Sequence, residues 1–320
     1  MIPIFTLNQD YEFSDIYNLL TAGVNCIRLN PARIGFPKTE QLLQVIRQIK
    51  KETDIFIDTP GNKARLHISG AVQKQKNEQL IIAFDNGTKA EAYIPKYFFR
   101  ELQSGDALIV RSKIPITMKV LEKYDSHLLC SVINAFDSIK NNTHVFLKNR
   151  CIVNSQINDE DFDVLKFVNE NKIGFVALSF SDTVEMLQEA KNAITNNSTK
   201  ILAKIESRVG VLNMRDILNE CDGIIIGRDD LSTVMSNDEI HKVVEQAVNL
   251  CRLQNKICIP ASNYFLGLTV SDCLTSDEYA ELKSLNNIHD GYIYCNESVL
   301  SSSLEIIKKI RRVIDQIGGQ

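Results

Sequence analysis

Short apolar runs recur along the chain, and each one is followed by polar, glycine or proline residues. Amphipathic stretches with apolar residues at i, i+3, i+4 and i+7 lie between most of them, for example residues 40–50 and 241–250. Strands that alternate with such helices indicate an α/β protein with a parallel sheet, and eight units predict a (β/α)8 TIM barrel, closed by a helix over residues 303–314. The eight runs are residues 2–8, 25–30, 54–58, 173–180, 200–206, 223–227, 257–262 and 291–295.

One interval breaks this repeat. About 115 residues separate the third run from the fourth, where roughly 20 to 35 is usual for this fold. Turn signals divide the interval into strand-like runs, so we expect a small all-β domain at residues 67–149, inserted after the third strand of a barrel formed by residues 1–66 and 150–320. We favour a lid at the active-site end over an inert decoration. The strand-like runs are residues 80–84, 90–94, 107–110, 117–121 and 127–132.

The amino-acid composition is that of an ordinary globular protein. It excludes some classes of function but does not indicate a particular one. The chain has 320 residues, of which 44% are hydrophobic and 24% charged, with a formal net charge of −4. A net negative charge does not indicate nucleic-acid binding, which usually needs a basic surface. No apolar run approaches the roughly 20 residues of a membrane span. The N-terminus lacks a signal peptide, and the eight cysteines are scattered without a CxxC pair. We therefore expect a cytoplasmic protein whose cysteines are reduced.

Candidate chemistry gathers at the ends of the fifth and sixth runs. Lys204 and Glu206 are two residues apart, so in a strand they share a face, and Asp230 follows about one strand-to-strand repeat later. A cation beside two carboxylates suits a divalent metal next to developing negative charge. The alternative from these residues alone is a structural network of ion pairs.

Other strand ends add polar residues at the same mouth of the barrel. A small phosphorylated or carboxylated anion, bound through a metal, would then be surrounded by the cluster around Lys204, by two arginines and by one hydroxyl group. Either arginine alone could be an ordinary surface residue. The added residues are Arg28 and Asn30 after the second run, Asp58 and Thr59 with Lys63 and Arg65 after the third, Ser262 after the seventh and Glu297 after the eighth.

Six segments resemble the pyruvate kinase family, in the family's order, and together they span most of the chain. The most specific is residues 201–213, ILAKIESRVGVLN, followed by residues 221–231, CDGIIIGRDDL. The others are residues 20–30, 58–65, 256–263 and 290–298. The inserted β domain lies where the family has its B domain. The sequence stops soon after the closing helix, so we expect no counterpart of the family's C-terminal domain in these 320 residues.

The resemblance implies a role for each candidate residue. Glu206 and Asp230 would bind Mg2+ or Mn2+, and Lys204 would stabilise the transferred phosphoryl group and the enolate oxygen. Arg28 and Arg65 would neutralise phosphate charge, and Ser262 would replace a threonine that manages the proton at the methyl carbon. The implied cofactors are the metal and ATP or ADP. The implied partners are that nucleotide and a small anionic substrate, without nucleic acid or membrane, and a homodimer through barrel helices is the candidate assembly.

The resemblance also implies a monovalent-cation site, formed by Asn30, Asp58 and Thr59. Ala32 stands where the family has a serine ligand of that site. Lys63 occupies a position where potassium-dependent members carry glutamate and potassium-independent members carry lysine. We therefore expect the Lys63 ammonium to substitute for K+, so that K+ is not required.

Three departures concern the nucleotide and the carboxylate of the substrate. Arg111 and its neighbours Ser112 and Lys113 stand where the family has an aspartate over the nucleotide-bound metal. Asp229 replaces a glycine whose backbone approaches the substrate carboxylate, and Asp182 stands where an arginine is expected. Our prediction is a divergent phosphotransferase acting on pyruvate, phosphoenolpyruvate or a similar oxyacid. The alternatives are a metal-dependent aldolase or lyase that forms a pyruvate-type enolate, or a catalytically weak regulatory paralogue.

Overall fold

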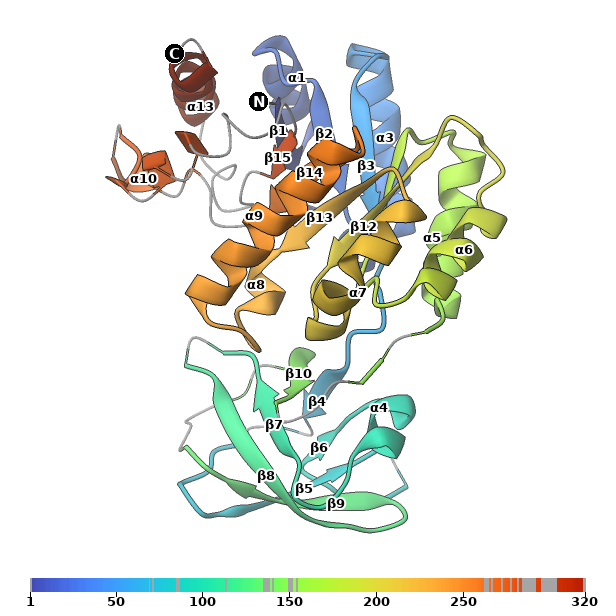
Figure 1. Ribbon diagram of the computed structural model, residues 1–320, viewed down its shortest axis with the longest axis vertical. Helices are drawn as coiled ribbons and strands as arrows, with labels where there is room; N and C mark the ends of the chain where they lie inside the picture. Colours follow the sequence, from blue (N-terminus) through green and yellow to red (C-terminus); the bar gives the residue numbers. More distant parts are fainter. Residues whose placement is uncertain are drawn as a thin grey trace. The chain divides into compact units, whose positions relative to one another are not determined.

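The chain folds into two compact units, which are described separately below (Figure 1). The large unit comprises residues 1–61, 154–232 and 236–320, and the small unit comprises residues 62–153 with residues 233–235. The computed structural model describes residues 2–68, 70, 72–84, 87–112, 114–134, 139, 141–148, 152–153, 155–261, 265, 267–271, 273–276, 278–280, 282–283, 292–294 and 304–318.

The large unit alternates strands with helices throughout the described part of the chain. Every one of the eight predicted apolar runs contains a strand, and the three predicted helices are confirmed within a few residues at each end. The elements are β1 (Ile2–Thr6), α1 (Phe13–Thr21), β2 (Cys26–Leu29), α2 (Pro31–Ile34), α3 (Phe36–Ile49), β3 (Asp54–Asp58), α5 (Asp159–Glu170), β11 (Phe175–Leu178), α6 (Val184–Ala193), β12 (Lys200–Ile205), α7 (Arg208–Asn219), β13 (Gly223–Gly227), α8 (Arg228–Leu231), α9 (Asn237–Leu253), β14 (Ile257–Ala261), α10 (Gly267–Val270), β15 (Tyr292–Tyr294) and α13 (Leu304–Gly318).

The eight strands of the large unit form one sheet in the order β14-β13-β12-β11-β3-β2-β1-β15. All neighbours pair in parallel, and the two outermost strands, β14 and β15, lie next to each other. One face of this sheet carries a continuous apolar cluster, in which the rings of Phe56 and Phe175 stack with centroids 4.2 Å apart. The cluster is formed by Ile4, Cys26, Phe56, Phe175, Ala177, Leu202, Ile225, Ile259 and Ala261.

The starts of α5 and α9 are fixed by side-chain caps that the sequence encodes. At α9 the Ser236 hydroxyl accepts from the Glu239 N–H, and the Glu239 carboxylate accepts from the Ser236 N–H at 2.7 Å, a reciprocal capping box. Asn158 and Asp161 form the same arrangement at α5. These caps satisfy donors that the first helical turn leaves without partners, so α5 and α9 each begin at a defined residue.

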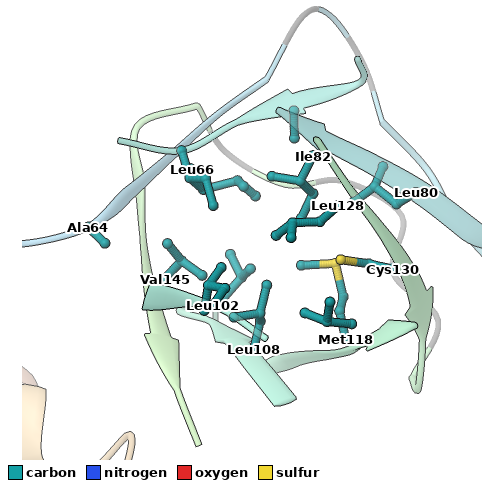
Figure 2. Close-up of a cluster of buried hydrophobic side chains, with 14 of the residues drawn as sticks. Ala64, Leu66, Leu80, Ile82, Leu102, Leu108, Met118, Leu128, Cys130 and Val145 are labelled. Carbon is teal, nitrogen blue, oxygen red and sulfur yellow. The ribbon is translucent and has the colours of Figure 1, made fainter. Parts of the chain in front are cut away.

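The small unit is a closed barrel of seven strands, in the order β10-β4-β6-β5-β9-β8-β7. Its interior is filled by apolar side chains that alternate with outward-facing ones along each strand, and Figure 2 shows this cluster with Leu66, Met118, Cys130 and Val145 among its members. The elements are β4 (Arg65–Ile68), β5 (Gln79–Ala83), β6 (Ala92–Tyr93), α4 (Lys96–Glu101), β7 (Ala107–Val110), β8 (Ile116–Lys123), β9 (His127–Val132) and β10 (Thr143–Leu147).

Three elements of the small unit were not predicted, namely β4, α4 and β10. The unit starts at Asn62, before the expected boundary at residue 67, because β4 pairs with β10 and β6 and so belongs to the small barrel. The five strands that were predicted there are all present. Within the described residues, no helix is long and apolar enough to cross a membrane.

Candidate active site

The apolar face of the large sheet continues directly into a polar layer at the carboxyl ends of its strands. Because side chains alternate along a strand, the residue two positions after each apolar cluster member points to the same side. Five consecutive strands place a polar residue at that position, and we call these five residues the charged layer. They are Thr6, Arg28, Asp58, Ser179 and Lys204, from β1, β2, β3, the end of β11 and β12.

Hydrogen bonds connect the charged layer from one strand to the next. Arg28 donates from Nε and Nη2 to the two carboxylate oxygens of Asp58 at 3.0 and 2.7 Å, and from Nη1 to the Thr6 hydroxyl at 3.1 Å. Lys204 Nζ lies 3.1 Å from Asp58 Oδ2 and donates to the Ser179 hydroxyl at 3.0 Å. The five side chains therefore form one continuous network across the sheet.

Glu206 joins this network at the end of β12. Its Oε1 lies 3.0 Å from Lys204 Nζ, and its Oε2 accepts from the Phe180 backbone N–H at 3.0 Å. An ammonium group has three N–H donors, and Lys204 has three acceptors within 3.1 Å, in Asp58, Ser179 and Glu206. Lys204 can contact a substrate only by exchanging one of these partners for it.

Burial makes the charges of this cluster strongly interdependent. Asp58 is 0% exposed, and Lys204 and Glu206 are 5% and 3% exposed. Burial opposes the ionisation of Asp58, but the adjacent Arg28 and Lys204 hold its pKa well below the ordinary value. Burial likewise disfavours the Lys204 ammonium, but the Asp58 and Glu206 carboxylates, with a smaller contribution from Asp230, raise its pKa above 10.5. Lys204 is therefore a fixed positive charge at neutral pH.

Asp230 lies in the first turn of α8, directly after β13, and is buried. The neighbouring strands β12 and β13 thus each deliver one buried carboxylate, Glu206 and Asp230. Gly227, the last residue of β13, provides the space: a Cβ there would lie 2.5 Å from Glu206 Cγ. Any larger residue at position 227 would displace the Glu206 side chain.

These two carboxylates fit one mode of metal binding. Among the described residues, no group of three or more His, Cys, Asp or Glu side chains could hold a metal ion. Mg2+ commonly takes only one or two protein carboxylates and completes its octahedron with water and substrate oxygens. Glu206 and Asp230 match that requirement, whereas an all-protein cage is not formed by the described part of the chain.

The residues expected to bind a monovalent cation are mostly committed to protein partners. Both oxygens of Asp58 accept hydrogen bonds from Arg28, and Oδ2 also contacts Lys204. The Thr59 hydroxyl accepts from the Ser179 N–H at 3.0 Å and hydrogen-bonds Asp161. Asn30 Oδ1 is buried without a hydrogen-bond partner among the described residues. The structure therefore neutralises Asp58 with two internal cations.

Several other predicted positions are located as follows. Lys63 and Arg65 belong to the small unit, where Arg65 Nη1 donates to the Asn142 carbonyl at 3.0 Å. Ser262 and Glu297 lie outside the described residues. Asp229 is half-buried beside Asp230 in the first turn of α8.

Asp182, the position where an arginine was expected, has a structural role in the large unit. It is fully buried and accepts a hydrogen bond from the hydroxyl of Ser207, while its carbonyl accepts from Asn213 Nδ2 at 2.8 Å. Ser207 is the N-cap of α7, so Asp182 places a negative charge at the start of that helix, where the helix dipole favours it.

Sequence reasoning missed Thr6 and Ser179 in the charged layer, as well as the structural role of Asp161. Asp161 accepts from the Gly61 N–H at 2.8 Å, which holds the turn that follows β3. Gly61 has a φ of +71°, and a Cβ there would lie 2.7 Å from Ser179 Cβ, so glycine is required. Thr6 and Ser179 could have been identified from the sequence, because each follows a member of the apolar cluster by two residues, as Lys204 does.

Comparisons with known proteins agree on one family. The family model described as "Pyruvate kinase, barrel domain" matches residues 6–295. Plastidial pyruvate kinase 2 from Arabidopsis thaliana is 23% identical over 278 residues, covering 83% of this chain and 48% of that protein. Pyruvate kinase from Clostridium perfringens is 24% identical over 304 residues, covering 90% of this chain and 63% of that protein. The chain thus spans about half to two thirds of the length of these relatives.

A solved structure shows the same fold. The crystal structure of a pyruvate kinase from Cryptosporidium parvum superposes with a TM-score of 0.84, covering 99% of this chain and 68% of that chain, at 20% sequence identity. At this identity the similarity concerns the fold, and the chemistry has to be argued from the residues of this chain.

Proposed function

The chain belongs to the pyruvate kinase family, and from this premise we propose that it is a divergent phosphotransferase. The proposed reaction moves a phosphoryl group between ATP or ADP and pyruvate, phosphoenolpyruvate or a similar small oxyacid. One observation carries the proposal: the buried, permanently charged Lys204 lies within 3.0 Å of Glu206 at the carboxyl end of the sheet. Phosphoryl transfer needs such a preorganised charge more than it needs covalent chemistry from the protein.

The proposed roles follow from the charges of the side chains and their burial. Lys204 stabilises negative charge on the enolate oxygen and on the transferred group. Arg28, whose side chain is 13% exposed, orients a phosphate while it remains anchored to Asp58. Glu206 and Asp230 would hold Mg2+ or Mn2+, which supplies charge neutralisation between phosphate and enolate oxygens when bound. Ser262 would act on the proton at the methyl carbon, as the resemblance implies.

The arrangement of the eight strands and of the inserted small unit supports this proposal. We infer that the eight parallel strands close into the (β/α)8 barrel, since β14 and β15 already lie next to each other. We further propose that the small unit, which the chain enters after β3 and leaves before α5, acts as a lid over the bound nucleotide. In such barrels the loops at the carboxyl ends of the strands carry the chemistry.

Potassium is not required in this proposal. Arg28 and Lys204 already neutralise Asp58, so a monovalent cation would find little uncompensated negative charge there. As the resemblance implies, the Lys63 ammonium would supply the remaining positive charge.

A second candidate is a metal-dependent aldolase or lyase that forms a pyruvate-type enolate without a nucleotide. The observation that favours it is that the charged layer, Glu206 and Asp230 all lie in the large unit alone. Arg111, where an acidic residue was expected over a nucleotide-bound metal, points in the same direction. Nucleotide binding distinguishes the two functions.

The deciding experiment is a screen of small hydroxy and keto acids with ATP and Mg2+, followed by ³¹P NMR. A new phosphoester or phosphoenol resonance with matching loss of the ATP γ-phosphate would support the phosphotransferase. Absence of any heat or thermal shift with ATP or ADP and Mg2+ would exclude it and favour the lyase, which the same acids without nucleotide would then reveal by carbon–carbon cleavage products.

A further inference from the structure

Asp161 makes more contacts than the start of a helix requires. It is the third residue of α5 and is fully buried, and its Oδ2 accepts from the Asn158 N–H at 3.4 Å as part of the capping box. Its Oδ1 accepts from the Gly61 N–H at 2.8 Å, and its carboxylate also hydrogen-bonds the Thr59 hydroxyl. Gly61 lies 100 residues earlier in the chain. The Asp161 carboxylate therefore joins α5 to the turn that follows β3.

Thr59 connects Asp161 to the end of β11. A hydroxyl group has one proton to donate and two lone pairs with which to accept. The Thr59 Oγ1 accepts from the Ser179 N–H at 3.0 Å, so its proton is the part that Asp161 binds. Thr59 and Ser179 are both 1% exposed, so water does not readily replace these bonds. Asp161 thus fixes the rotation of the Thr59 hydroxyl, and this hydroxyl holds the backbone of Ser179.

Gly61 brings the second contact of Asp161 to the same residue. A Cβ at Gly61 would lie 2.7 Å from Ser179 Cβ and 3.1 Å from the Ser179 carbonyl oxygen. The turn after β3 therefore packs directly against Ser179, and Asp161 Oδ1 holds the turn in that place. Two contacts of one carboxylate converge on Ser179.

The backbone after Ser179 is in a conformation that needs such support. Phe180 has a φ of +51°, in the left-handed region that is unfavourable for a residue with a Cβ. Its N–H donates to Glu206 Oε2 at 3.0 Å, and the preceding N–H, of Ser179, donates to Thr59. Unfavourable backbone conformations persist where the surrounding contacts determine them. The Thr59 hydroxyl, oriented by Asp161, is one of these contacts.

Ser179 is in turn a partner of Lys204. Lys204 Nζ donates to the Ser179 hydroxyl at 3.0 Å, and its two other acceptors are the carboxylates of Asp58 and Glu206. An ammonium group is attracted to the full charge of a carboxylate, whereas a hydroxyl offers only a dipole. The Ser179 hydroxyl is therefore the partner that a substrate oxygen replaces at the least cost. Its position marks where that oxygen would bind.

We propose that Asp161 is a positioning residue for Lys204. It acts on Ser179 through two contacts, the Thr59 hydroxyl and the Gly61 backbone, and so sets the place at which the ammonium meets its substrate. This inference rests on the proposed role of Lys204 and extends it to a residue that does not touch the substrate. All the contacts from Asp161 to Lys204 lie within the large unit.

The inference is tested by amide hydrogen exchange, measured by NMR on the full chain with no ligand added. In Asp161→Asn we expect the Ser179 N–H to exchange about tenfold faster, the effect of losing one hydrogen bond of ordinary strength. The reason is that three donors point at the two carboxylate oxygens, and an amide has only one oxygen to offer them.

A second variant and a control separate this role from helix capping. Asp161→Glu keeps the charge and the capping box but displaces the carboxylate by one methylene, so it should have the same effect, and it serves if Asp161→Asn does not fold. Asn158→Ala is the matched control, because it removes the other half of the capping box and leaves the Asp161 carboxylate in place. It should speed exchange at the start of α5 and leave the Ser179 N–H as in the parent chain.

Two results would overturn the inference. One is a Ser179 N–H that exchanges at the parent rate in both Asp161 variants, and the other is an equal increase in Asn158→Ala. If the exchange responds as expected while the parent chain phosphorylates no acid, the phosphotransferase proposal fails, and the connection from Asp161 to Lys204 stands. If the parent chain transfers phosphate, Asp161→Asn should lower kcat/KM about tenfold and Asn158→Ala should not, since misplacing a catalytic group slows the reaction. Transfer at the parent rate in Asp161→Asn would refute the positioning role alone.

Discussion

Lys204 and Asp58 are in contact although their strands are not neighbours. Lys204 Nζ on β12 reaches over β11 and lies 3.1 Å from Asp58 Oδ2 on β3, with the Ser179 hydroxyl of the intervening strand 3.0 Å away. The contact therefore connects three strands at their carboxyl ends. Asp58 also anchors Arg28, so the proposed catalytic cation Lys204 and the arginine depend on the same carboxylate.

Asp58→Asn should destabilise the fold in a pH-dependent way. The substitution leaves Arg28 and Lys204 without their shared carboxylate, and loss of one partner of a buried pair costs about 3 kcal/mol. The pKa of Asp58 is lowered in the folded chain, so its contribution is complete above the ordinary value of 3.8 and is lost as the pH falls below it. Urea unfolding at pH 7 and pH 3 should show a large difference between parent and variant at pH 7 and a smaller one at pH 3. Equal differences at both values would refute the assigned pKa shift.

Lys204→Met should abolish phosphoryl transfer, with a fall of at least about a thousandfold, because it removes the buried positive charge that lies 3.0 Å from Glu206. Rates from ³¹P NMR or a coupled assay measure this. Lys200→Met on the same strand is the control, since Lys200 is exposed and contacts the Phe175 ring instead. A variant that is folded by circular dichroism and retains its rate would remove Lys204 from the mechanism.

Gly227→Ala should displace the Glu206 side chain. The new Cβ would lie 2.5 Å from Glu206 Cγ, and such overpacking costs about 1–3 kcal/mol while turning the carboxylate away from Lys204. Gly174→Ala is the matched control, because a Cβ there meets nothing within 4 Å. Thermal melting of both variants gives the comparison. Equal melting temperatures would mean that Glu206 is not confined by β13.

Glu206→Gln and Asp230→Asn should each weaken Mn2+ binding by at least about tenfold, a typical effect of removing a group that supports a metal site. Free Mn2+ is measured by electron paramagnetic resonance, with no substrate present. Glu170→Gln, in which an exposed carboxylate is neutralised, should bind Mn2+ as the parent does. If all three variants bind alike, the metal site is elsewhere.

Potassium should leave the proposed reaction unchanged. Asp58 is already neutralised by Arg28 and Lys204, so titration with KCl against matched tetramethylammonium chloride should alter the rate by less than about twofold, the range expected from ionic strength on screened surface charges. A strong, saturable activation by K+ would show that Asn30, whose buried Oδ1 has no hydrogen-bond partner among the described residues, takes part in a cation site after all.

The eight strands of the large unit were predictable because each is a short apolar run with clear ends, for which a parallel sheet is the natural solution. The strands β4 and β10 were not, because their outward positions carry Arg65, His67 and His144, and four or five residues of mixed polarity give no decisive period.

The sequence predicted that Lys204 and Glu206 share a face, but it did not predict how the charged side chains pair. The offset of two residues placed Lys204 and Glu206 on one face, as the structure has them. Nothing in the sequence specified that Asp58 would be held by Arg28, because the two are brought together by the lateral pairing of β2 with β3. Asp182 shows the same limit, since its role depends on where α7 begins.

The stacked rings of Phe56 and Phe175 affect how water and ions reach the charged layer. Phe56 lies two residues before Asp58, and Phe175 lies four residues before Ser179 on the adjacent strand, so the two rings belong to the apolar layer next to the charged layer. Water and ions do not readily cross such an apolar layer, so we expect the charged groups to exchange protons and ligands at the carboxyl ends of the strands. The proposed substrate, metal and product would then all pass these strand ends, and the order in which they do so becomes part of the kinetics.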